Sequence, residues 1–174
     1  MERQARSVRY AWDPTKGNYV GQITDPGLPG GVYATDTDAL RDILDAMIFI
    51  CADLAERKIG NPYEMRADTL EESRFSANST NDYRSNIQGV LYLYQGGKQA
   101  NSYGISGLVI SKSGFDLDNK VFLELSNAVN AINALIPTFA SSLNANPDAV
   151  ASARTAVRTL RVTLETQVKP VLLQ

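Results

Sequence analysis

The sequence of 174 residues contains no histidine and a single cysteine. The absence of histidine removes the commonest transition-metal ligand and the side chain best suited to proton transfer near neutral pH. One cysteine excludes an intrachain disulfide and a Cys-x-x-Cys metal site. Cys51 lies within the apolar stretch AMIFICADL, where a small buried thiol is expected. Carboxylates are the only strong metal ligands left, so we expect this chain alone to bind zinc or ferrous iron weakly, if at all.

The chain also lacks long runs of positive charge and long apolar runs. Its formal net charge is -2, and no more than two lysines or arginines are adjacent. This pattern does not favour nucleic acid or an anionic membrane surface as a partner. No run of about 18 apolar residues occurs, so no transmembrane segment is predicted. The polar start, MERQARSVRYAWDP, has no apolar signal-peptide core and no helix-capping signal, which is typical of a segment cut from a longer protein.

What the sequence does contain is a series of helical patterns. Apolar residues at i, i+3 and i+4 spacing predict a first helix that begins near Asp38, where Thr35, Asp36 and Thr37 offer N-cap oxygens. We expect it to end near Gly60, because glycine favours the position after a helix and Pro62 opposes continuation. The punctuated segment before it, GNYVGQITDPGLPGGVYATDTD, is predicted to be a long surface loop.

Three more helices are predicted downstream. One begins within FSANSTNDYRSN, where Ser79 or Thr80 is the expected N-cap, and ends at Gly96-Gly97. A long helix extends from about residue 117 to 139, with Pro137 expected to kink or end it. The last opens at Asn146-Pro147-Asp148. The segment SYGISGLVISKSG between them fits either helical turns or an extended piece.

Four amphipathic helices with short or medium connections pack most simply as an antiparallel bundle. We therefore predict an all-α protein, an antiparallel four-helix-bundle-like domain with a long irregular N-terminal loop. Residues 1–174 would form a single helical domain, with a helix remnant and loop over 1–37 and the bundle over 38–174. Asp38, Asp42 and Asp45 share one side of the first helix, and we interpret them as a solvated acidic face in preference to a calcium site.

Several motifs together resemble the C-terminal half of the imelysin family, also called insulin-cleaving or iron-regulated imelysin-like proteins. They are ERKIGNP, then EESRFSANSTNDYRSNIQGVLYLYQGG, and a terminal helix that closes on TLETQVKPVL. Upstream, AWDPTKGNYV and TDTDALRDILDAMI resemble the entry into the second domain of the family. The likeness covers about residues 10–172.

The resemblance implies an all-helical protein of two bundle-like halves, linked to iron uptake and exported to the bacterial periplasm or cell surface, often as a lipoprotein. The family was first described as metallopeptidases, with a G-x-H-x-x-E motif in the N-terminal half. This chain has no histidine, so no catalytic residue is predicted in it, and iron or zinc would belong to a full-length parent. The expected partner is that N-terminal half, or a second copy of the chain in contact with its exposed Val8, Tyr10 and Trp12.

The resemblance also implies the position of a site. The family segment E-S-x-[YF]-S-x-N-S corresponds here to a polar stretch that would line a metal or ligand site between the halves. The residues carried over to this cleft wall are Glu72, Ser73, Ser76, Asn78, Ser79, Asp82 and Asn86. The alternatives are the inactive half of a metallopeptidase and a helical module used for protein contacts.

Overall fold

The computed structural model describes residues 2–99 and 103–174, and within these ranges the regular structure is entirely helical. This confirms the all-α prediction. The chain divides into two compact units, Met1–Asp45 and Ala46–Gln174. Over the described residues, no helix combines the length and the apolar character needed to cross a membrane.

The first unit contains two short helices and the start of a longer one, namely α1 (Glu2–Trp12), α2 (Tyr19–Thr24) and the first turns of α3 (Asp36–Ala52). The prediction of an unbroken loop is wrong at α2. Asn18 takes the left-handed conformation, with φ 47°, and its side chain accepts a hydrogen bond from the Gly21 N–H, which caps this helix. At α3 the Thr35 Oγ1 accepts from the Asp38 N–H at 3.2 Å, so Thr35 is the one of the three predicted candidates that caps this helix.

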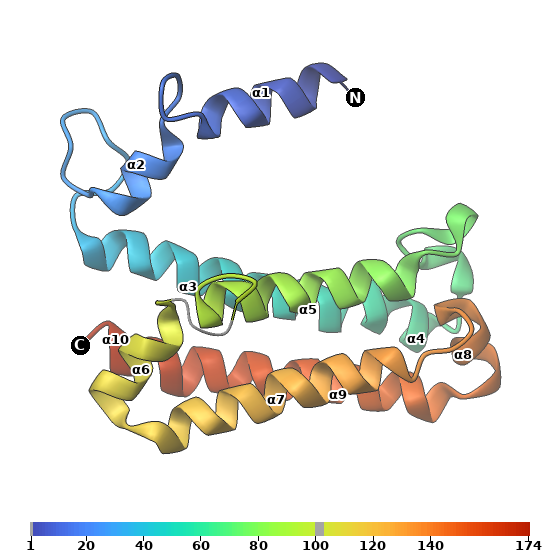
Figure 1. The fold of residues 1–174 in the computed structure, drawn as a ribbon. Helices are drawn as coiled ribbons and strands as arrows, with labels where there is room; N and C mark the ends of the chain where they lie inside the picture. The colour runs from blue at the N-terminus through green and yellow to red at the C-terminus, as the bar shows by residue number, and fades with distance from the viewer. Residues whose placement is uncertain (1, 100–102) are drawn as a thin grey trace. The chain divides into compact units, whose positions relative to one another are not determined.

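The second unit is a bundle of four helical runs, which Figure 1 shows side by side with connections at both ends. The first run continues α3 through η1 and α4, and the last continues α9 through η4 and α10. The elements are η1 (Asp53–Gly60), α4 (Asn61–Met65), η2 (Asp68–Leu70), η3 (Arg74–Ser76), α5 (Ser79–Gln95), α6 (Ile105–Ser113), α7 (Phe115–Asn133), α8 (Phe139–Ala145), α9 (Pro147–Thr163), η4 (Leu164–Val168) and α10 (Lys169–Leu172). Helix α7 packs on both α5 and α9, and α9 packs on η1.

Several predicted helix ends are confirmed. Gly96 ends α5 in the left-handed conformation with φ 87°, as a glycine without a Cβ permits. Helix α7 ends before Pro137, and Asn146 caps α9 by accepting from the Ala149 N–H at 3.3 Å. The segment left open by its sequence forms α6, although its first residue, Ser102, lies outside the described residues.

The prediction that the first long helix ends near Gly60 is wrong, because η1 is π-helical and the chain continues into α4 with Pro62 in its first turn. In an α-helix, an interior proline clashes with the carbonyl four residues earlier. The wider i→i+5 turns of a π-helix differ from that arrangement, and here they precede the proline. That carbonyl belongs to Lys58, and it accepts a hydrogen bond from the Tyr83 hydroxyl at 2.9 Å. The π-helical η4 stands in the same relation to Pro170, at the start of α10.

The core of the second unit is formed by the inward stripes of the four runs. Cys51 is fully buried, as expected, and burial raises the pKa of its thiol to about 12. The Tyr83 and Phe139 rings meet edge to face at 5.2 Å. The largest fully buried side chains of this unit are Met47, Leu54, Ile59, Tyr83, Ile87, Tyr94, Leu125, Ile132, Leu135, Phe139 and Leu160.

Candidate functional site

The polar segment, which we define as residues 71–86, folds around the buried side chain of Tyr83. Its ring is fully buried, and its hydroxyl donates to the Lys58 carbonyl oxygen. Burial, together with the negative charge of Glu71, raises the pKa of Tyr83. The hydroxyl therefore keeps its proton and remains a donor, which joins the polar segment to the turn around Pro62.

The loop that precedes α5 is held by hydrogen bonds among its own residues. The Ser73 N–H donates to Ser79 Oγ at 3.0 Å, and the Ser76 hydroxyl donates to the Ser73 carbonyl at 3.2 Å. The prediction that Ser79 or Thr80 caps α5 is wrong, because Asn78 occupies the cap position. The Ser79 hydroxyl closes the loop instead, and that of Thr80 donates to the Leu135 carbonyl at 3.4 Å, in the connection after α7.

Two carboxylates in this segment each keep a buried oxygen without a hydrogen-bond partner among the described residues. Asp82 Oδ1 accepts from Asn78 Nδ2 at 2.8 Å, while its Oδ2 is buried and unpartnered. The Asp82 backbone carbonyl accepts from Asn86 Nδ2 at 3.0 Å. Glu71 is only 8% exposed, and its Oε2 is also unpartnered. Since buried polar atoms are normally paired, these two oxygens stand out as acceptors that lack a donor.

A groove of about 460 Å³ lies beside the start of the segment. Glu72 and Lys58 form an ion pair in it, with Nζ and Oε1 2.8 Å apart. The other lining residues are Arg57, Asn61, Met65 and Leu70. Of the seven residues predicted from the sequence, Glu72 is the one that lines this groove, whereas the other six contact one another or neighbouring backbone.

Glu71 was missed by the sequence reasoning. The motif begins with two adjacent glutamates, and no local signal tells which of them turns inward. The structure decides this through the short 3₁₀ turn η2, whose last hydrogen bond is donated by the Glu71 N–H to the Asp68 carbonyl.

Glu71 and Asp82 do not belong to a larger group of metal ligands in the described part of the chain. Among residues 2–99 and 103–174, no group of three or more histidine, cysteine, aspartate or glutamate side chains could hold a metal ion. Zinc requires about four ligands and calcium six or more. The oxygens of Glu71 and Asp82 can therefore supply only part of a coordination shell.

A second polar cluster joins the first helical run to α9. Arg154 donates to the Ala55 carbonyl at 3.1 Å, to Glu56 at 3.1 Å and to Glu64 at 2.6 Å. Arg158 also donates to Glu56, through Nε at 2.7 Å and through a second guanidinium nitrogen. These bonds, led by that of Arg158, lower the pKa of Glu56 to about 2. The cluster ties two helices together and is satisfied by its own members, which indicates a structural role.

Comparison with known proteins gives one family. The family model described as Imelysin matches residues 1–167. The crystal structure of an imelysin peptidase from Bacteroides ovatus is similar in fold, with a TM-score of 0.77 and 23% identity, over 89% of this chain and 45% of that chain. The chain thus spans less than half the length of that protein. No curated protein matches it.

Proposed function

Because this chain belongs to the imelysin family, we propose that it is a binding domain whose polar segment forms one wall of a ligand site. The observation that carries the proposal is the pair of buried carboxylate oxygens, on Glu71 and Asp82, without partners in the described residues. Burial of an acceptor without a donor costs about 1–3 kcal/mol. A ligand that offers a cation or hydrogen-bond donors would recover this cost.

The remainder of such a site would come from another part of a longer protein. Two carboxylates fall short of a metal shell, since no group of three or more histidine, cysteine, aspartate or glutamate side chains in the described residues could hold a metal ion. The matched Bacteroides protein extends well beyond the part that this chain covers. We infer that a facing half, or a second copy of the chain, completes the site, and that iron or zinc is the cation it would take.

The same resemblance supports a place for this function. Imelysin-like proteins are linked to iron uptake at the bacterial periplasm or cell surface, and we propose that setting here. A peptidase role would require residues from the facing half, because this chain has no histidine to serve as base or ligand.

Paramagnetic broadening tests the wall even when affinity is low. Addition of Mn²⁺, an air-stable stand-in for Fe²⁺, to the isotope-labelled chain should broaden the amide signals of residues 71–86 before others. The double change Glu71→Gln and Asp82→Asn should abolish this preference. The matched control Asp116→Asn, at an exposed carboxylate of α7, should leave it unchanged.

Two outcomes of the Mn²⁺ experiment would contradict the proposal. Broadening spread evenly over exposed carboxylates, or unchanged by the double substitution, would refute the proposed wall. Circular dichroism should confirm that each variant keeps its helical content, and the single substitutions replace the double one if it does not fold.

A further inference from the structure

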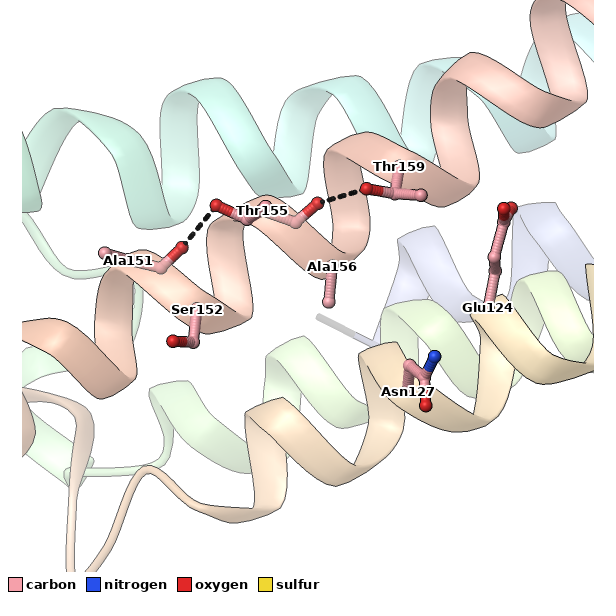
Figure 2. A pocket seen from close by; sticks show the side chains of 7 residues that line it. All are labelled: Glu124, Asn127, Ala151, Ser152, Thr155, Ala156 and Thr159. Atoms are coloured by element: carbon pink, nitrogen blue, oxygen red, sulfur yellow. Dashed lines mark hydrogen bonds between the residues drawn. The ribbon is translucent and has the colours of Figure 1, made fainter.

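A second groove, distant in sequence from the polar segment, lies between α7 and α9 within the second unit. Its volume is about 390 Å³, which falls in the range of small-molecule sites. Figure 2 shows its walls, with Glu124 and Asn127 on α7 and small side chains on α9. Its lining residues are Glu124, Asn127, Ala151, Ser152, Thr155, Ala156 and Thr159.

Glu124 is the unusual member of this groove. Only 8% of it is exposed, although it is an acidic residue that lines a surface groove. Its Oε1 accepts a hydrogen bond from the Thr163 hydroxyl at 3.0 Å. Its Oε2 is buried and has no partner among the described residues. In Figure 2 the side chain rises from α7 toward α9, so the carboxylate lies at the wall of the groove, with one buried oxygen that lacks a donor.

The neighbouring hydroxyls on α9 are already committed as donors. The Thr155 hydroxyl donates to the Ala151 carbonyl at 2.8 Å, and the Thr159 hydroxyl donates to the Thr155 carbonyl at 3.0 Å. Figure 2 draws both bonds as dashed lines. A hydroxyl whose proton is used in this way can still accept through its lone pairs. This wall of the groove therefore offers acceptors.

The charge of the groove also favours a cationic ligand. Among its seven described lining residues, Glu124 is charged and none is a lysine or arginine. Burying a carboxylate without a counter-charge is costly, and a bound cation would remove much of that cost. A hard metal ion is disfavoured, because calcium takes six to eight oxygen ligands and a single carboxylate is present here.

We propose that the α7–α9 groove binds a small organic ammonium ion, with its N–H donors on Glu124 Oε2 and the threonine oxygens. The methyl groups of Ala151 and Ala156 would contact the hydrocarbon part of the ligand. An ammonium group supplies three donors and one positive charge, which matches a carboxylate beside the two threonine oxygens. This site is separate from the wall at residues 71–86 and does not depend on it.

A pair of isosteric probes tests the proposal. Titration of the labelled chain with n-butylammonium chloride should shift the amide signals of residues that line the groove, while 1-butanol at the same concentrations should not. The substitution Glu124→Gln should weaken butylammonium binding about tenfold or more, as expected for loss of a charge-assisted hydrogen bond. Asp148→Asn, at an exposed carboxylate of α9 outside the groove, is the matched control and should bind as the unchanged chain does.

Three results would overturn the proposal: equal binding of 1-butanol, unchanged binding by Glu124→Gln, or preference for Ca²⁺ over butylammonium. Should Glu124→Gln lose its helical circular dichroism signal, Ala156→Leu decides, because it fills the groove without changing charge. Loss of butylammonium binding in that variant supports the site, and retained binding refutes it.

Discussion

Replacement of Arg154 by methionine tests how the first helical run and α9 are held together. The side chain is 10% exposed and donates to the Ala55 carbonyl and to two glutamates, Glu56 and Glu64. Methionine keeps the buried stem but removes every donor. The backbone carbonyl would then lose a partner inside the protein, while both glutamates, which are about half exposed, could return to water.

The expected loss in the free energy of unfolding depends on how buried each partner of Arg154 is. Loss of the buried carbonyl's partner costs about 1–3 kcal/mol, and each partly exposed ion pair contributes about 0–1 kcal/mol. With values near the middle of these ranges, we expect Arg154→Met to lower the free energy of unfolding by about 2–3 kcal/mol. For a chain of this size, this corresponds to a fall of about 4–12 °C in melting temperature.

Urea and thermal unfolding followed by circular dichroism measure this effect, and Arg158→Met provides the matched control. Arg158 also pairs with Glu56, but its side chain is 43% exposed and, within the described residues, no backbone carbonyl accepts a hydrogen bond from it. Its replacement should cost no more than about 1 kcal/mol. Equal losses in the two variants would refute the view that the buried carbonyl bond, and not net charge, makes the difference.

Three further predictions concern the same part of the bundle. Gly60→Ala should lower the free energy of unfolding by about 1–3 kcal/mol, because a Cβ there would lie 2.8 Å from the Ala55 carbonyl oxygen. The control Gly89→Ala, where a Cβ meets open space on a helical backbone, should be neutral or stabilising in urea unfolding. The pKa of Glu56 is lowered from 4.5 to about 2, so its contribution to stability is present above pH 4.5 and is lost as the pH falls toward 2. The melting temperature of Glu56→Gln should therefore fall less over this pH range than that of the unchanged chain. Parallel curves of melting temperature against pH would contradict the assignment. Tyr83→Phe removes the hydroxyl that donates to the Lys58 carbonyl, which Pro62 has no N–H to satisfy. It should lower the free energy of unfolding by about 1–3 kcal/mol. Stability equal to that of the unchanged chain would contradict this prediction.

The sequence predicted several features that depend on neighbouring residues, although it missed helix α2 and the cap of α5. The cap at Asn146, the glycine end at Gly96 and a cap among Thr35, Asp36 and Thr37 were predicted correctly, because their signals lie within a few residues of the helix end. The helix was wrongly ended at Gly60, because the same Gly-x-Pro signal fits both a helix end and a π-helical turn. Local sequence does not distinguish the two.

The polar segment was located from its motif, and the structure gathers its residues around one tyrosine. The open carboxylate of Glu71 was missed, because burial depends on how the 3₁₀ turn packs. The groove at Glu124 and the cluster at Arg154 were missed for another reason. Their partners come from helices that are far apart along the chain, and one sequence does not reveal which helix faces meet.

The close approach of Gly60 and Arg154 has a consequence for related sequences. A Cβ on residue 60 would lie 3.0 Å from Arg154 Nη2 and closer still to a backbone oxygen. The absence of a side chain at one position therefore creates the space that the guanidinium occupies at the other. In homologues the two positions should covary: where a larger residue replaces the glycine, we expect a shorter uncharged side chain in place of the arginine. The KIGNP motif would then reflect the packing of two helices, and its glycine would be retained together with Arg154, which lies far away in the sequence.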